Sequence, residues 1–128
     1  MEWAHGVIRR QWSIIAEPSW NKRLDFATEW TIRSGKPEFL GYSIFEASSR
    51  GKYHGNVEDS QENLLKRIQK AAPSFGEDII EAQKMALATH IAPFYEGPLG
   101  IDMLSDNEGN INSCVEINLR LTMGHLSL

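Results

Sequence analysis

Apolar and polar residues alternate along a run in the first half of the chain. The run from Leu24 to Arg33 alternates between two sets of residues, namely Leu24, Phe26, Thr28 and Trp30, and Asp25, Ala27, Glu29 and Thr31. Alternation of this kind is typical of a strand with one buried face. Ser-Gly-Lys-Pro follows and predicts a turn, so the next run, Glu38 to Ser48, is expected to return as the antiparallel partner.

Two shorter signals flank this hairpin. Gln11 to Glu17 is an apolar run stopped by Pro18, which predicts a strand followed by a turn. Lys52 to Asn56 follows an Arg-Gly turn signal and predicts one further short strand. The opening residues, EWAHGVIRRQW, read as the tail of a helix. Successive strands with tight turns indicate an antiparallel sheet.

The middle of the chain changes to a helical period. Asp59 with Glu62 is a capping pair that predicts a helix to about Ala72, and Ser74 with Glu77 predicts a second one that Pro93 ends. The second helix carries one stripe at three- and four-residue steps: Ile79, Ile80, Gln83, Ala86, Leu87, His90, Ile91 and Phe94. Strands, two helices and a final hairpin predict an α+β fold, with helices packed on one face of an antiparallel sheet.

The final hairpin, Gly100 to Arg120, carries the clearest chemistry. A three-residue loop, Glu108 to Asn110, would pair Asn107 with Ile111 and set Asp102 directly opposite Glu116. Alternation then directs one polar set to one face: Asp102, Glu116, Asn118 and Arg120. The apolar set is expected to face a core: Ile101, Met103, Val115, Ile117 and Leu119. Opposed carboxylates repel each other, so the pair favours a site for an oxygen-seeking cation such as Mg²⁺.

This arrangement resembles the end of the ATP-grasp domain, in which an acidic residue on one strand and E-x-N on the next hold magnesium against ATP. The matching residues are Asp102, Glu116 and Asn118, and Arg120 sits where many members place an arginine that faces phosphate or substrate. The resemblance implies ATP and Mg²⁺ (or Mn²⁺) as cofactors. It also implies transfer of the γ-phosphoryl group to a carboxylate, which gives an acyl phosphate open to attack.

The run EINLRLTMGH is also similar to the biotin-carboxylase branch of the family, which has E-x-N-x-R-L and a histidine at the position of His125. That branch has a glutamate before the histidine, as a base on bicarbonate, and this chain has Gly124. A carboxylase is therefore disfavoured and a general ATP-dependent ligase remains. His125 is expected either to share the family's position or to lie in a frayed terminus.

Two further segments are candidates for ligand contacts. The stretch Ile14 to Ser19 lies where the family places a hinge beside adenine, so Ile15, Ala16 and Glu17 are its candidate contacts, Glu17 with adenine or ribose. Lys52, His54 and Asn56 form a polar cluster after a glycine that would approach the triphosphate or the acceptor. For both segments the alternative is an ordinary solvated loop or strand end.

Composition narrows the class of protein. The net charge of −4 disfavours a nonspecific nucleic-acid binder, and the four tryptophans are expected to serve core packing and hinge contacts. No apolar run is long enough for a membrane span and no secretion leader opens the sequence. The single cysteine, Cys114, excludes an internal disulfide, and by parity it shares the strand face of Glu116. A cytoplasmic location is expected.

At 128 residues, the chain is about half of a complete ATP-grasp module, so it is expected to be a segment whose N-terminal half is missing. The parent would join a small-molecule or peptide carboxylate to an amine or similar nucleophile. The isolated segment, without the family's phosphate-contacting lysine, is expected to show no ligase turnover. The alternative is a non-catalytic α+β module that binds a partner and whose acidic hairpin is merely solvated. Hydrolysis by a carboxylate pair needs groups set across a cleft and fits direct strand neighbours less well.

Overall fold

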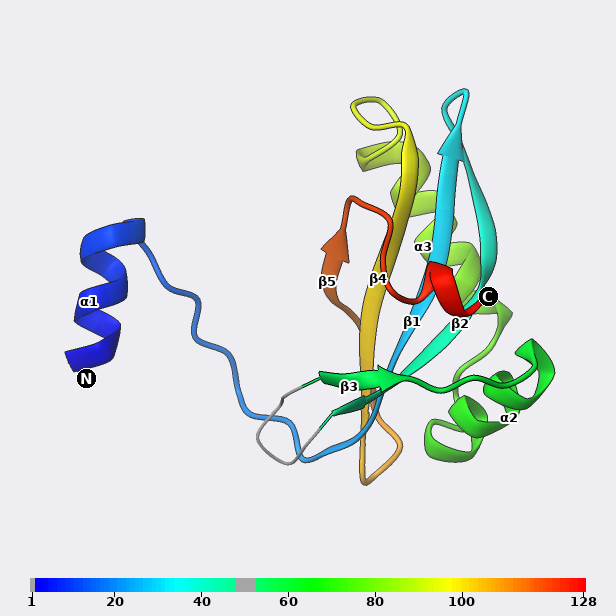
Figure 1. Ribbon diagram of the computed structural model, residues 1–128, viewed down its shortest axis with the longest axis horizontal. Helices are drawn as coiled ribbons and strands as arrows, with labels where there is room; N and C mark the ends of the chain where they lie inside the picture. Colours follow the sequence, from blue (N-terminus) through cyan, green and yellow to red (C-terminus); the bar gives the residue numbers. More distant parts are fainter. Residues whose placement is uncertain (1, 48–52) are drawn as a thin grey trace.

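The computed structural model describes residues 2–47 and 53–128, in which the strands form one antiparallel sheet of order β3-β2-β1-β4-β5 (Figure 1). The strands are β1 (Lys22–Arg33), β2 (Lys36–Ala47), β3 (Tyr53–Asn56), β4 (Gly97–Asp106) and β5 (Ile111–Asn118). The α+β class expected from the sequence is confirmed. β1 is the central strand, and its middle is buried on both faces.

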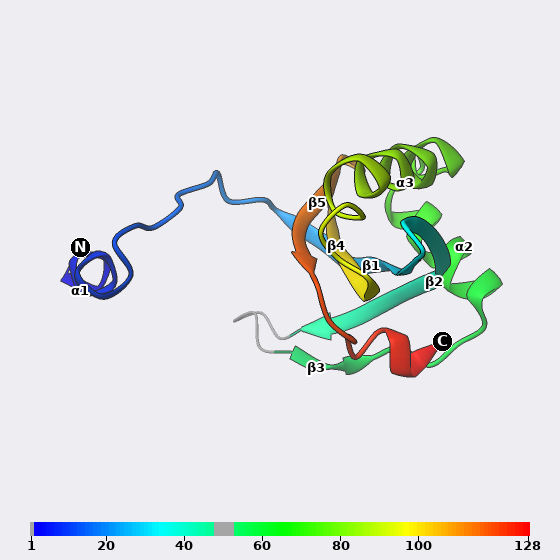
Figure 2. The same cartoon turned by 90° about the horizontal axis from the view of Figure 1, so that it is seen from above.

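The two faces of the sheet are covered differently. Helices α2 (Gln61–Ala71) and α3 (Glu77–His90) pack on one face (Figure 2). On the opposite face runs the C-terminal strap, residues 119–128, which ends in the short 3-10 helix η1 (His125–Ser127). The sheet is therefore the middle of three layers, two built from regular elements and one from a single extended segment.

The hydrophobic core lies between the sheet and the two helices. Strands contribute Phe26, Trp30, Ile32, Ile44, Leu99, Ile101 and Met103, and the helical half contributes Leu64, Ile68, Ala72, Phe75 and Leu87. The Phe26 and Phe75 rings meet edge to face, with centroids 5.4 Å apart. The predicted burial of Ile101 and Met103 is confirmed. The prediction is wrong for Val115, Ile117 and Leu119, which keep 47%, 37% and 46% of their surface exposed.

The β1–β2 hairpin closes through a two-residue turn. Ser34 and Gly35 both have positive φ, 49° and 72°, and Arg33 pairs with Lys36. Positive φ at both central residues matches the twist of the flanking strands, which is why such turns close hairpins tightly. The predicted pairing is confirmed, although both strands begin two residues before the predicted Leu24 and Glu38. The predicted end of the second strand, Ser48, lies outside the described residues.

The turn between β4 and β5 is longer than predicted. Ser105, and not Asn107, pairs with Ile111, and the Asp106 N–H donates to the Asn110 carbonyl at 3.1 Å. The side chain of Asp106 explains the larger loop, because its carboxylate accepts from the Asn110 N–H at 2.9 Å and stabilises the turn from within. Gly109 has the predicted left-handed conformation, with φ 86°.

A β-bulge then restores the predicted register. Between the pairs Asp102–Glu116 and Leu104–Asn112, β4 advances by two residues and β5 by four. Asp102 therefore does lie opposite Glu116, because the longer turn and the bulge shift the register in opposite directions. Within the bulge, Cys114 turns to the helix side and lines an apolar cavity with Ile117, so its predicted face is wrong. Burial raises the pKa of the Cys114 thiol.

Both helices begin at other caps than those predicted. Ser60, not Asp59, caps α2, and its Oγ accepts from the Asn63 N–H at 3.3 Å. The Asp59 carboxylate accepts instead from the Ser60 N–H and the Asn63 side chain. α3 begins after Gly76 without a side-chain cap, so the capping role predicted for Ser74 is wrong.

The α3 stripe packs as predicted at most of its positions. Gln83 and Leu87 are buried, and Ile79, Ile80 and Ile91 pack against the core. The helix ends at His90, ahead of Pro93. Phe94, predicted on the stripe, follows the last helical turn and is 89% exposed, so that part of the prediction is wrong.

The N-terminal arm lies apart from the sheet (Figures 1 and 2). α1 (Glu2–Gln11) is helical as expected but buries none of its residues. Residues 12–21 contain neither helix nor strand, so the strand predicted from Gln11 to Glu17 is wrong. Trp12 is 91% exposed, which contradicts a packing role for it. No helix in the described part of the chain is long and apolar enough to cross a membrane.

Candidate functional site

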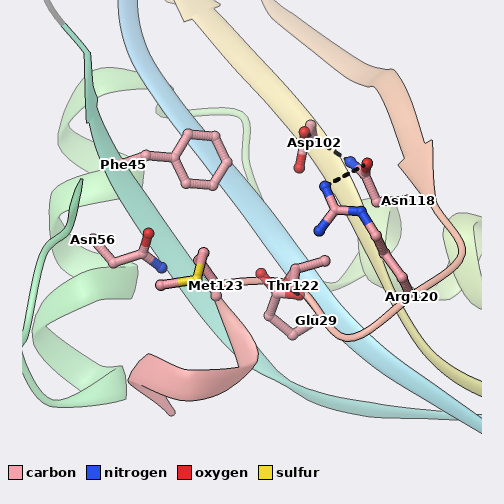
Figure 3. A pocket seen from close by; sticks show the side chains of 9 residues that line it. Glu29, Phe45, Asn56, Asp102, Asn118, Arg120, Thr122 and Met123 are labelled. Carbon is pink, nitrogen blue, oxygen red and sulfur yellow. Dashed lines mark hydrogen bonds between the residues drawn. The ribbon is translucent and has the colours of Figure 1, made fainter. Parts of the chain in front are cut away.

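A pocket of about 290 Å³ opens on the face of the sheet opposite the helices (Figure 3). It is lined by Glu29, Phe45, Asn56, Asp102, Asn118, Arg120, Thr122, Met123 and Gly124. Figure 3 shows Asp102, Asn118 and Arg120 on one side, Phe45 and Asn56 on the other, and the strap between them. The pocket thus has a charged side and a more apolar side.

Strand register brings the polar residues of the pocket together. Glu29 on β1 pairs with Gly100 on β4, which pairs in turn with Asn118 on β5. Two residues earlier on β1, Ala27 pairs with Asp102 of β4, and Asp102 pairs in turn with Glu116 of β5. Side chains in such cross-strand rows share a face of the sheet. Because Gly100 lacks a side chain, the Glu29 carboxylate fits over this position, where a Cβ would lie 2.9 Å from Glu29 Oε2.

Asp102 is the electrostatic centre of the charged side. Burial, followed by the charges of Glu116 and Glu29, raises its pKa to about 6, against the opposing effects of Asn118 and Arg120. The Asn118 Nδ2 group donates to Asp102 Oδ2 at 3.0 Å. An ionised Asp102 is therefore disfavoured by its surroundings until a proton or another cation compensates for it.

Arg120 completes the charged side from just beyond β5. Its Nη2 donates to Asn118 Oδ1 at 3.3 Å, so Asn118 bridges the arginine and Asp102. Arg120 is exposed, and its guanidinium can grip an anionic group with two parallel hydrogen bonds. Asp102, Asn118 and Arg120 thus share one pocket, as the alternation predicted. Glu116 is exposed opposite Asp102 and is not among the residues that line the pocket.

The predicted metal ligands have the right chemistry but not a formed cage. Within residues 2–47 and 53–128, no three His, Cys, Asp or Glu side chains gather as a metal-binding group. Asp102, Glu116 and Asn118 offer two carboxylates and an amide oxygen, the hard donors that Mg²⁺ prefers. Asn118 would have to turn its Oδ1 from Arg120 toward the ion. The donor set fits Mg²⁺, and metal binding here stays a prediction.

Glu29 is a residue of the site that sequence reasoning missed. Its side chain is only 1% exposed, and both carboxylate oxygens accept hydrogen bonds. Ser43 Oγ donates to Oε1 at 2.7 Å and Thr122 Oγ1 donates to Oε2 at 2.8 Å. His125 Nδ1 lies 3.0 Å from Oε2 and forms an ion pair with it when the ring is protonated. The sequence holds no signal for this role, because Glu29 falls in the alternation of β1 where a solvated residue of the strand would also fall.

His125 is held in place and does not lie in a frayed terminus. Its Nε2 lies 3.0 Å from the Trp30 carbonyl oxygen, an acceptor, so Nε2 carries a proton. Nδ1 lies 2.8 Å from Thr122 Oγ1. Gly124 is explained by the same packing, because a Cβ there would overlap Glu29 Oε1 and lie 2.6 Å from Ser43 Oγ.

The other predicted contacts are not gathered at this pocket. Ile15, Ala16 and Glu17 lie in the exposed N-terminal arm, and none of them lines the pocket, so the predicted hinge strand is not formed. Lys52 lies outside the described residues. Asn56 lines the pocket, and its Nδ2 donates to Ser127 Oγ at 3.0 Å.

Comparison with known proteins adds no relative. No protein-family model matches the chain, and no curated protein is significantly similar to it.

Proposed function

We propose that this pocket binds the phosphates of a magnesium–nucleotide complex, and that the chain is the C-terminal part of an ATP-grasp ligase. The observation that carries the proposal is the register of β4 and β5, which sets Asp102 opposite Glu116 and beside Asn118. Arg120 borders the same pocket and offers a positive group for phosphate or a substrate carboxylate.

The raised pKa of Asp102 also supports a cation at this position. Its burial beside Glu116 and Glu29 makes the ionised form costly, and a divalent ion bound to the carboxylate would offset that cost. Surface residues with only a solvating role gain nothing from two carboxylates at adjacent strand positions. A cation between Asp102 and the phosphate oxygens would turn the repulsion into binding energy.

In the proposed reaction, an oxygen of the substrate carboxylate attacks the γ-phosphorus and ADP leaves, giving an acyl phosphate. An amine or similar nucleophile then attacks the acyl carbon, inorganic phosphate leaves, and the nucleophile loses a proton. Magnesium, held by Asp102, Glu116 and Asn118, would neutralise the phosphate charge, and Arg120 would orient phosphate or carboxylate. The rest of the parent protein would supply the remaining phosphate contacts.

The N-terminal arm favours a second candidate, a non-catalytic module that binds a partner protein. Trp3, Trp12 and Ile15 expose more than three quarters of their surface, and α1 buries nothing. Large exposed apolar side chains mark surfaces that another chain covers. Such a partner could equally be the missing half of the same domain, so the arm does not contradict the ligase proposal.

A titration of the isotope-labelled chain with Mg²⁺–ATP, and with Mn²⁺ as a paramagnetic probe, separates the candidates. The ligase proposal expects weak binding, with Mn²⁺ broadening the amide signals of Asp102, Glu116 and Asn118 first. Glu116→Gln and Asn118→Ala should each weaken binding about tenfold, the loss of one charge-assisted contact. Glu81→Gln on α3 and Asn107→Ala in the turn are matched controls that should bind normally. Undiminished binding in Glu116→Gln and Asn118→Ala would favour the non-catalytic partner-binding module.

The proposal also expects the isolated chain to show no ligase turnover, since half of the catalytic module would be missing. Release of ADP from ATP in the presence of a carboxylate and an amine is the measurement. Turnover by this polypeptide alone would contradict the assignment as a segment.

A further inference from the structure

The strap is held on the sheet mainly by polar contacts, because only Leu119 and Leu128 of its large apolar side chains bury slightly more than half of their surface. Leu121, Met123 and Leu126 each keep more than half of their surface exposed. Exposed side chains of this kind contribute little of the hydrophobic stabilisation that normally docks a terminal segment. Hydrogen bonds join the strap to the sheet instead. Two of these polar contacts end on one buried carboxylate, beside the hydrogen bonds of His125 with the Trp30 carbonyl and of Asn56 with Ser127.

That carboxylate is Glu29, which lies 93 residues before Thr122 in the chain. Thr122 Oγ1 donates to Oε2 at 2.8 Å, and His125 Nδ1 lies 3.0 Å from the same oxygen. Ser43 on β2 donates from its Oγ to the other carboxylate oxygen, Glu29 Oε1, at 2.7 Å. A carboxylate buried to this degree is retained only when its oxygens are fully satisfied, so strap and carboxylate depend on each other.

We propose that Glu29 is a positioning residue, whose buried carboxylate fastens Thr122, Gly124 and His125 to the sheet and thereby sets Arg120 at the pocket. Arg120 is two residues from Thr122, and its guanidinium lies 3.3 Å from Asn118 Oδ1. Docking of Thr122 therefore restricts the path of the chain on the C-terminal side of Arg120. Met123 lies between Thr122 and Gly124 in the strap and lines the same pocket.

The two glycines of the contact leave the space that the Glu29 carboxylate occupies. A Cβ at position 100 would lie 2.9 Å from Glu29 Oε2, and one at position 124 would overlap Oε1. The φ of Gly124 is −60°, which any residue adopts, so the glycine serves close approach and not backbone conformation. Adding a methyl group at Gly124 therefore tests the contact with little direct effect on the backbone.

Docking of the strap and occupation of the pocket are expected to be coupled, because Arg120, Thr122, Met123 and Gly124 belong to both. A ligand that contacts these residues stabilises the docked strap, and by linkage a loosened strap lowers ligand affinity to the same extent. Only this coupling rests on the proposed function. The fastening itself is a property of the free chain.

Hydrogen exchange followed by mass spectrometry tests the fastening in the free protein. Thr122→Val removes the hydroxyl that touches both Glu29 and His125, and Gly124→Ala displaces the strap sterically. Each should speed exchange of residues 119–128 about tenfold, the effect of losing a charge-assisted hydrogen bond, with residues 24–33 of β1 unchanged. The matched controls are Thr89→Val on α3 and Gly6→Ala on α1, where a Cβ meets only Arg10 at 4.0 Å.

A rescue variant separates the fastening from general damage. Glu29→Asp withdraws the carboxylate by one methylene, so the combination of Gly124→Ala with Glu29→Asp should slow strap exchange again relative to Gly124→Ala alone. Unchanged strap exchange in both Thr122→Val and Gly124→Ala would overturn the proposal. Failure of the rescue would overturn the part that assigns the contact to Glu29.

The positioning of Arg120 is read from NMR signals that need no ligand. In Thr122→Val, the Arg120 amide and the Asn118 side-chain amide should both shift, and Mg²⁺–ATP affinity should fall about tenfold with the strap. Unshifted signals with a loosened strap would overturn the role in setting Arg120. Shifted signals in a protein that binds no Mg²⁺–ATP would support the fastening and refute the proposed function.

Discussion

The two faces of the sheet are built from the same strands and stabilised in opposite ways. On the helix side, Phe26 and Trp30 of β1 are fully buried against apolar side chains. On the strap side, Glu29 of the same strand is buried just as deeply against hydroxyl groups and an imidazole. Apolar burial on the helix side therefore stabilises the fold. On the strap side, the burial of charged groups around a pocket costs part of that stability.

The helix side also buries polar side chains, namely Thr28, Gln83 and Ser105, but all three are neutral. Gln83 on α3 accepts from Thr28 Oγ1 at 2.8 Å and donates to the Ser113 carbonyl at 2.9 Å. Gln83 thus joins α3 both to the central strand β1 and to the bulged part of β5. Gln83 is neutral and both ends of its amide are hydrogen-bonded, whereas the strap side concentrates the charged residues Glu29, Asp102 and Arg120 around the pocket. Among the buried residues that the structure describes, charge is thus confined to the strap side of the sheet, where it borders the pocket.

The largest effect is expected for Phe26→Ala, which tests whether the helix side carries the stability. Removing a buried ring that packs against Phe75 should lower the free energy of unfolding by about 3–5 kcal/mol. Urea unfolding followed by circular dichroism measures it. Phe94→Ala removes an exposed ring and should change the same quantity by less than about 0.5 kcal/mol. Equal effects of the two variants would break the comparison.

A smaller effect is expected for Gln83→Leu, which leaves the Thr28 hydroxyl and the Ser113 carbonyl without this partner. The expected loss of unfolding free energy is about 1–3 kcal/mol, the cost of unsatisfied buried groups. Adding Thr28→Val removes the orphaned hydroxyl and should recover part of the loss in the same urea titration. A double variant as unstable as the two single losses combined would show that the bridge is not a coupled unit.

The smallest effect, and one of opposite sign, is expected for Asp102→Asn on the strap side. The pKa of Asp102 is raised from 3.8 to about 6, so protonation favours the folded state. That stabilisation is complete below about pH 4 and is lost as the pH rises through 6. At pH 8 the variant, which needs no proton, should therefore be more stable than the wild type by about 1–2 kcal/mol, after allowing for solvent screening of a half-buried group.

The pH dependence makes that test decisive. At pH 4 the advantage of Asp102→Asn should vanish, because the wild-type carboxyl is protonated as well. Glu38→Gln on the exposed surface of β2 is the matched control and should be neutral at both pH values. An advantage of the same size at pH 4 and pH 8 would show that charge at Asp102 is not what costs stability.

The local pattern was sufficient for much of the fold. Alternation predicted β1 and its hairpin partner, and the helical period predicted both helices that cover the sheet. It also directed Asp102 and Asn118 to the face of the sheet that carries the pocket, because strand alternation depends only on neighbouring residues. These features follow from backbone geometry within a few residues of each position.

Sequence reasoning was less reliable where distant contacts compete with local signals. The pairing of Asp102 with Glu116 was predicted correctly through an incorrect turn, because a bulge that no local signal marked shifted the register back. The apolar run Gln11 to Glu17 has strand composition, yet it forms no strand in the described structure. A strand requires a hydrogen-bonding neighbour, and β1, which follows this run, pairs instead with β2 and β4.

The buried carboxylate and its strap belong wholly to the tertiary structure. Nothing near Glu29 in the sequence distinguishes it from a solvated residue on the polar side of a strand. Its partners Ser43, Thr122 and His125 come from β2 and from the far end of the chain. Alternation says which face a side chain takes, but only the path of the folded chain decides what covers that face. Whether a charged group such as Glu29 is removed from water therefore depends on contacts with residues far away in the sequence.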